Sequence, residues 1–140
     1  MKKRFEIGTA MESNTEYIAE EKIYHVYQKD TVRLSDDRYI PQRGKSEPEF
    51  DAFLVIKDQK NITLDFGGAT IVLHGKIQPF LLDHAENITI KNCKVTYDRP
   101  PFTEFTILET GADFVKLKAN EGCTYRIEDR KLIPCSETWE

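Results

Sequence analysis

The segment Asn61-Ile62-Thr63-Leu64 and its near copy Asn87-Ile88-Thr89-Ile90 decide the fold class of this sequence. The two copies lie 26 positions apart (87 − 61), and each follows a short apolar run. The same shift pairs Thr70 with Thr96 and keeps apolar residues opposite apolar residues at most neighbouring positions. A repeat of 20–50 residues indicates a solenoid, in which one supersecondary unit stacks on the next.

Short β-rich runs separated by polar turns surround both copies. We predict strands at Phe53–Lys57, Asn61–Asp65, Thr70–Leu73, Pro79–Asp83, Asn87–Lys91 and Lys94–Asp98. Runs of about five residues that repeat with the length of one coil favour a parallel β-helix over a hairpin sheet. Stacking would place Ile62 over Ile88 and Leu64 over Ile90.

Asn61 and Asn87 begin equivalent strands, so two interpretations remain open for them. Their side-chain amides would form a ladder from coil to coil. Alternatively, each is an ordinary turn asparagine that tolerates left-handed backbone geometry.

The N-terminal region predicts a cap for the first coil. Ser13-Asn14-Thr15-Glu16 has the form of a capping box, and apolar residues at helical spacing follow it, so we predict a helix over about 15–27. Ile23–Tyr27 would also suit a strand. Thr31–Leu34 alternates like a strand, a turn at Ser35-Asp36-Asp37 and a strand at 38–40 follow, and Gln42–Glu49 reads as a loop.

After Arg99-Pro100-Pro101 the repeat ends and two β-hairpins are predicted. Their strands are Phe105–Glu109 with Phe114–Lys118, and Tyr125–Ile127 with Leu132–Ile133. The sequence thus divides into a cap (1–52), coils (53–103) and a hairpin insert (104–140). No capping helix follows the coils, so we expect the N-terminal piece of a longer protein whose open end could self-associate.

Composition excludes several classes of function. A formal charge of −4 over 140 residues without a basic stripe argues against a nucleic-acid partner.

No signal peptide and no run of transmembrane length is visible. This predicts a cytoplasmic protein without a membrane partner, although a secreted parent whose signal is removed would look the same. Cys93, Cys123 and Cys135 lack CxxC spacing, which favours free thiols over a disulfide framework or a zinc site.

The repeat resembles the early coils of right-handed parallel β-helix carbohydrate enzymes of the pectin-lyase-like superfamily. The resemblance spans about Phe53 to Thr103. Its most specific motif, Tyr97-Asp98-Arg99-Pro100-Pro101-Phe102-Thr103, is most similar to α-1,3-galactosidases of glycoside hydrolase family 110. The resemblance implies a carbohydrate substrate and two catalytic carboxylates on later coils. Nothing in this sequence matches those coils, so no catalytic residue is carried over.

Asp98 and Arg99 are the predicted substrate-contacting residues. Asp65 and Asp98 each end a predicted strand, where a side chain would reach a groove, and Arg99 would keep the Asp98 carboxylate ionised. A salt bridge at the corner that begins the hairpins is the structural alternative. The aromatic residues near this corner could stack on sugar rings or simply form core: Tyr97, Phe102, Phe105 and Tyr125.

No cofactor and no metal site is predicted. Asp36-Asp37 is a poor calcium site, and His25, His74 and His84 lack HxH or HExxH spacing. A non-catalytic glycan-binding or structural β-helix and a polysaccharide lyase remain alternatives to the hydrolase. An acidic calcium cluster with a nearby Arg or Lys would favour the lyase.

Overall fold

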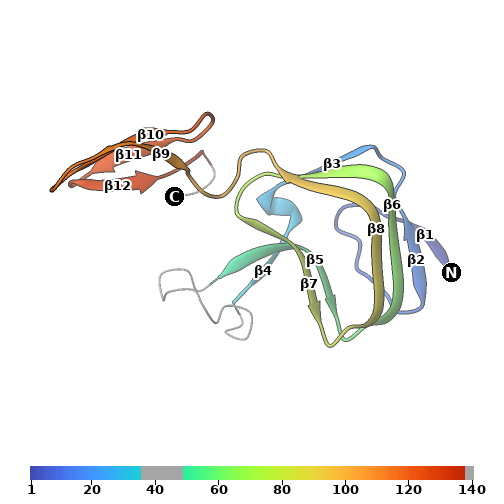
Figure 1. Ribbon diagram of the computed structural model, residues 1–140. Helices are drawn as coiled ribbons and strands as arrows, with labels where there is room; N and C mark the ends of the chain where they lie inside the picture. Colours follow the sequence, from blue (N-terminus) through green and yellow to red (C-terminus); the bar gives the residue numbers. More distant parts are fainter. Residues whose placement is uncertain (36–48, 138–140) are drawn as a thin grey trace. The chain divides into compact units, whose positions relative to one another are not determined.

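The computed structural model describes residues 1–35 and 49–137, and in these residues the chain is all-β, as predicted (Figure 1). It divides into two compact units, Met1–Asp98 and Arg99–Glu140. The predicted strand at 38–40, the Asp36-Asp37 pair and most of the predicted loop at 42–49 lie outside the described residues.

A mainly parallel sheet forms one wall of the first unit. Its strands are β1 (Lys2–Arg4), β2 (Thr15–Ile18), β3 (Ile23–Val26), β6 (Lys60–Leu73) and β8 (Glu86–Tyr97). On one side, β6 pairs with β2 through its first half and with β3 through its second half, and on the other side it pairs with β8. All of these pairs are parallel.

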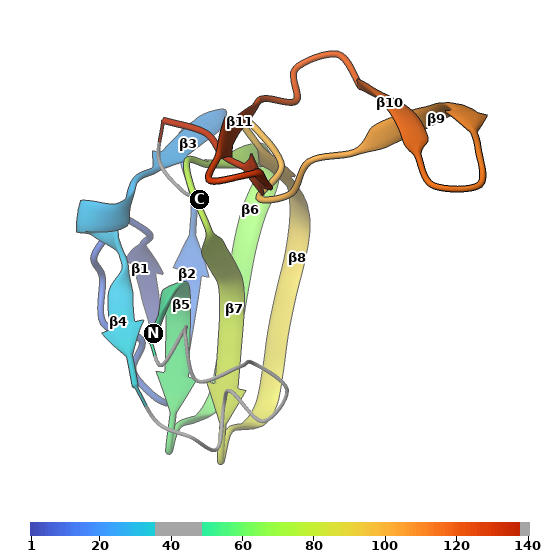
Figure 2. The ribbon, with the colours of Figure 1, turned by 90° about the vertical axis from the view of Figure 1, so that its left-hand side faces the viewer.

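The second sheet faces the first in Figures 1 and 2 and consists of β4 (Val32–Leu34), β5 (Phe50–Lys57) and β7 (Ile77–Asp83). β4 is antiparallel to β5, whereas β5 and β7 are parallel. A single 3₁₀ turn, η1 (Gln28–Asp30), lies between β3 and β4 in the sequence.

The 26-residue repeat sets the register between β5 and β7, and between β6 and β8 as far as Asp65. Beyond Asp65 the offset between β6 and β8 is 24 (94 − 70), so the predicted pairing of Thr70 with Thr96 is wrong and Thr70 lies opposite Lys94. Ile62 lies opposite Ile88, and Leu64 opposite Ile90, which confirms the predicted stacking. In the second sheet Leu54 lies opposite Phe80, again 26 positions on (80 − 54). The strands are longer than predicted, because β6 and β8 each join two predicted strands. In β6 the junction is Gly67-Gly68, where both residues have positive φ and the register with β8 shifts.

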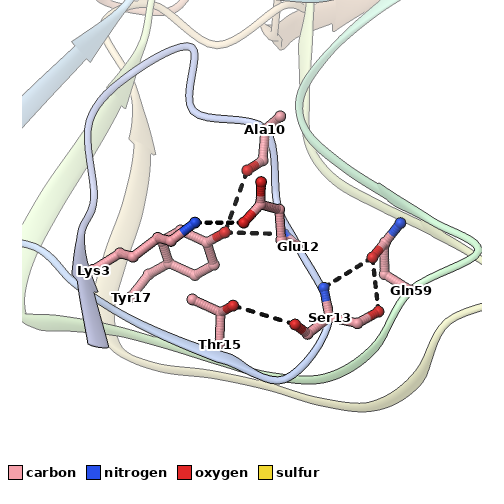
Figure 3. A network of polar contacts seen from close by, with 7 residues as sticks. All are labelled: Lys3, Ala10, Glu12, Ser13, Thr15, Tyr17 and Gln59. Carbon is pink, nitrogen blue, oxygen red and sulfur yellow. Dashed lines mark hydrogen bonds and ion pairs between the residues drawn. The ribbon is translucent and has the colours of Figure 1, made fainter. Parts of the chain in front are cut away.

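The predicted helix at 15–27 is wrong, because β2 and β3 occupy this segment. The Ser13 hydroxyl donates to Gln59 Oε1 at 2.7 Å and accepts from the Lys60 backbone N–H at 2.9 Å, so it caps no helix (Figure 3). Side chains of Tyr17, Tyr24 and Val26 are buried while their neighbours are more exposed, an alternation with the period of a strand.

The core of the first unit lies between the two sheets and is rich in aromatic rings. Phe5, Tyr24 and Phe66 meet edge to face, with centroid distances of 5.2–6.0 Å. Aliphatic residues of the strands complete the core: Ile56, Ile62, Leu64, Ile71, Leu73 and Val26. The Tyr17 ring is also buried, and its hydroxyl donates to Ala10 O and accepts from the Glu12 N–H (Figure 3).

An asparagine ladder runs across the first sheet. Asn61 Nδ2 donates to Asn14 Oδ1 at 3.0 Å, and Asn87 Nδ2 donates to Asn61 Oδ1 at 2.9 Å. All three residues have left-handed backbone geometry, with φ between 53° and 62°. Both interpretations of these asparagines therefore hold together: each tolerates a left-handed corner, and each extends the ladder.

The edge strands of the first unit differ in chemistry. β1 is only three residues long, and its Lys2, Lys3 and Arg4 pair with glutamates of the segment that follows. In the described part of the chain nothing pairs with the outer edges of β7 and β8. Ile88 and Ile90 are half-buried there, although their register partners Ile62 and Leu64 are 1% and 0% exposed.

The second unit consists of the two predicted hairpins. β9 (Phe105–Thr110) pairs with β10 (Val115–Ala119), and β11 (Tyr125–Glu128) pairs with β12 (Lys131–Pro134), both antiparallel. Positive φ at Asp129 and Arg130 forms the two-residue turn of the second hairpin. None of residues 99–137 is fully buried.

Candidate functional site

Asp98 lies at the corner directly after β8. Its backbone N–H donates to Leu73 O at 3.0 Å, which fixes the residue beside the end of β6. Its carboxylate lies 3.4 Å from His74 Nδ1, and its side chain is 67% exposed. The carboxylate therefore faces solvent while a histidine orients one of its oxygens.

His74 connects Asp98 to a second histidine. His74 Nε2 and His25 Nδ1 are 2.9 Å apart, within hydrogen-bond distance, and the Asp98 carboxylate lies at ion-pair distance from the other nitrogen of the His74 ring, so the three side chains form one line of polar contacts. The His74 backbone N–H donates to Val26 O at 2.9 Å, which holds it beside the end of β3. Tyr27 stacks on the His74 ring at 4.3 Å with planes 13° apart. We call Tyr27, His25, His74 and Asp98 the histidine corner.

The histidine corner was not predicted from the sequence. His25 and His74 are 49 positions apart (74 − 25), and β3 and β6 bring them together. His74 follows a predicted strand, where a surface position is usual, but its side chain is only 16% exposed. β3 and β6 pair with an offset of 47 positions (70 − 23). The repeat found in the sequence has an offset of 26, so it gave no signal for the contact between His25 and His74.

Arg99 stabilises the loops of the second unit. Its guanidinium donates to Gly122 O at 2.7 Å, to Cys135 O at 3.0 Å and to Thr103 Oγ1 at 3.4 Å. Cys135 O also accepts from the Thr124 hydroxyl, so Arg99 and Thr124 meet at one loop carbonyl. Asp98 and Arg99 thus make their described contacts in different units, Asp98 with the strand ends and Arg99 with the hairpin loops.

Asp65 forms a second polar cluster, in the middle of the first sheet. Asp65 Oδ1 accepts from the Gly67 N–H and from Asn92 Nδ2, both at 2.9 Å, and Lys91 Nζ lies 3.5 Å from Oδ2. The Asn92 hydrogen bond, the Gly67 N–H and the Lys91 charge hold the pKa of this carboxyl below its usual range. Asp65 therefore stays ionised and suits hydrogen bonding better than proton donation.

An open hollow borders this cluster, lined by Asp65, Gly67, Gly68, Asn92, Cys93 and Lys94. Burial raises the pKa of the Cys93 thiol, which agrees with the prediction of an inert thiol. All three cysteines are free.

The predicted aromatic group separates into two local contacts. Tyr97 donates its hydroxyl to Ile77 O at 2.8 Å and packs against the core, and burial raises its pKa. In the second unit the rings of Phe105 and Tyr125 lie 5.6 Å apart. These contacts favour a packing role for Tyr97, Phe105 and Tyr125.

Among residues 1–35 and 49–137, no group of three or more His, Cys, Asp or Glu side chains converges as a metal-binding set. No candidate membrane-spanning helix is found in the same residues.

Comparison with known proteins gives a consistent set of relatives. The chain is 32% identical over 119 residues to alpha-1,3-galactosidase A of Bacteroides thetaiotaomicron, an alignment that covers 81% of this chain and 21% of that protein. It is 31% identical over 102 residues to alpha-1,3-galactosidase B of Phocaeicola vulgatus (72% and 17%) and 27% identical over 108 residues to alpha-1,3-galactosidase B of B. thetaiotaomicron (76% and 17%). The chain thus spans about a fifth of the length of these curated relatives. No protein-family model matches it.

Proposed function

We propose that this chain is the N-terminal segment of a glycoside hydrolase that acts on α-galactosides. The similarity to alpha-1,3-galactosidases over 81% of the chain carries the proposal. Hydrolysis would use two carboxylates, one as general acid and one as base or nucleophile, on parts of the enzyme outside this chain. The chain alone would then be inactive.

In this proposal the first unit forms the early coils of a right-handed parallel β-helix of the pectin-lyase type. Three observations support it: the parallel register between β6 and β8, the same 26-residue offset between β5 and β7, and the asparagine ladder. Residues 1–52 would be the cap, 53–103 the coils and 104–140 the hairpin insert. The next coil would pair with the open edges of β7 and β8. In the isolated chain these edges would drive self-association.

Asp98 is the proposed carbohydrate contact, and the next residue, Arg99, begins the second unit. The exposed Asp98 carboxylate has an oxygen available to accept hydrogen bonds from sugar hydroxyls, since His74 engages the other. Its position directly after β8 would place it on a wall of the substrate groove.

A chimera tests the proposal. The matched segment of alpha-1,3-galactosidase A of B. thetaiotaomicron is replaced by this chain, and release of galactose from an α-1,3-linked galactoside is measured. We expect a folded chimera with activity within about tenfold of the parent, and no turnover by the isolated chain. A folded but inactive chimera would contradict the proposal, as would efficient hydrolysis by the isolated chain. Asp98→Asn in the chimera should raise KM more than it lowers kcat.

A further inference from the structure

We propose that the histidine corner binds a divalent transition-metal ion, Zn²⁺ in the first instance, through His25 Nδ1 and His74 Nε2. This inference is independent of the proposed hydrolase activity. It starts from the 2.9 Å separation of these two ring nitrogens, which belong to residues at the ends of neighbouring strands.

His74 already has the environment of a metal-binding histidine. A ligating imidazole usually donates its other ring N–H to a carboxylate, which fixes the tautomer and leaves the opposite nitrogen free to bind. The Asp98 carboxylate lies 3.4 Å from His74 Nδ1 and favours the proton on that nitrogen, so we assign the lone pair to Nε2. Tyr27 stacks on the ring at 4.3 Å and restricts its rotation.

His25 supplies the second ligand from an exposed position. Zinc–nitrogen bonds of about 2.0–2.1 Å in tetrahedral geometry place two ligating nitrogens of one ion about 3.3 Å apart, so the two rings need to separate only slightly from the observed 2.9 Å. The proton between the two nitrogens must leave before an ion can bind, and a change of tautomer in the His25 ring moves it from Nδ1 to Nε2. The exposed His25 ring must also turn until both lone pairs meet at the ion.

Water would complete the coordination, because only two protein ligands converge here. The site would have one protein ligand fewer than the three of open, catalytic zinc sites and two fewer than the four of structural sites. Imidazole suits Zn²⁺, Cu²⁺ and Ni²⁺, whereas Mg²⁺ and Ca²⁺ prefer oxygen ligands and should not bind. An ion at this corner would join the end of β3 to the end of β6, with Asp98 after β8 behind it.

Isothermal titration of the full chain with ZnCl₂ at pH 7.5 tests the inference, with the cysteines replaced by serine in every protein so that thiols do not compete. We expect one ion per chain, with no heat from MgCl₂. His25→Ala and His74→Ala should each weaken binding at least about tenfold, and Asp98→Asn about tenfold, as expected for an outer-shell partner. The matched control is His84→Ala, which changes the third histidine and should bind as the parent does.

A second measurement keeps the test independent of variant stability. In the parent protein, Zn²⁺ should shift the NMR resonances of the His25 and His74 rings and leave those of His84 in place. Equal zinc affinity in His25→Ala and the parent would overturn the inference. So would zinc-induced shifts at His84 alone, or no binding at millimolar zinc.

Discussion

The side-chain amide of Asn92 donates to the Asp65 carboxylate at 2.9 Å and so ties the middle of β8 to the middle of β6. The two residues lie on paired strands, next to the Gly67-Gly68 break in β6. Each additional hydrogen bond to the carboxylate favours its ionised form. The stability of the pairing between β6 and β8 should therefore depend on the ionisation of Asp65.

Acid should weaken the fold through Asp65. Its pKa is lowered in the folded state, so its contribution to stability is complete above the unfolded value of about 3.9 and is lost as the pH falls through the lower folded value. Thermal unfolding between pH 7 and pH 2.5 measures this loss. Asp65→Asn should flatten the decline, whereas Asp113→Asn, which changes an exposed turn carboxylate, should leave it unchanged. Parallel curves for Asp65→Asn and the parent would contradict this expectation.

Removing the central rung of the asparagine ladder should destabilise the first unit. Asn61→Ala deletes two side-chain hydrogen bonds, each with a net contribution of about 1 kcal/mol, and places alanine at φ 56°, which costs about 1 kcal/mol more. We expect a total loss of about 3 kcal/mol in urea unfolding. Asn61→Gly accepts the left-handed backbone, so its smaller loss separates strain from the ladder. Equal losses in the two variants would mean that strain contributes nothing.

Truncation should cost more in β6 than at the equivalent position of β8. Ile62→Ala opens a cavity in the closed core and should lose about 3 kcal/mol, whereas half-buried Ile88→Ala should lose roughly half as much in the isolated chain. Urea unfolding of both variants measures the difference. In the galactosidase chimera a further coil would cover Ile88, so its truncation should there approach the cost at Ile62. An unchanged ratio in the chimera would mean that no coil covers β8.

Cys93 should react slowly while the chain is folded. Burial raises the pKa of its thiol, which leaves less of the nucleophilic thiolate at neutral pH. Iodoacetamide labelling followed by peptide mass spectrometry should show slower modification of Cys93 in the folded chain than in urea. The same rate in both conditions would mean that the thiol is not shielded.

The 26-residue repeat predicted the register of β5 with β7, and of the first halves of β6 and β8, because apolar residues at fixed offsets must share one core. It did not predict the change of offset from 26 to 24 after Asp65. Ile62 and Ile88 are paired as the repeat requires. The helix prediction failed at Ser13, where a local capping pattern competed with bonds to Gln59 and Lys60. Those partners are more than 45 positions away, so local sequence could not reveal them.

The candidate site was predictable only in part. Asp98 was selected because it ends a strand, and the structure places it there. Its neighbours His74 and His25 come from other strands, and no motif spacing connects them. Arg99 is adjacent in sequence, yet its described bonds go to the loops of the hairpins.

The unequal edges of the first unit also give its assembly a direction. The short, charged β1 is translated before the other described strands and discourages strand addition, whereas the long edges of β7 and β8 are translated later and remain able to accept strands. A nascent chain of this sequence would therefore fold vectorially, with each finished layer serving as the template for the layer translated after it.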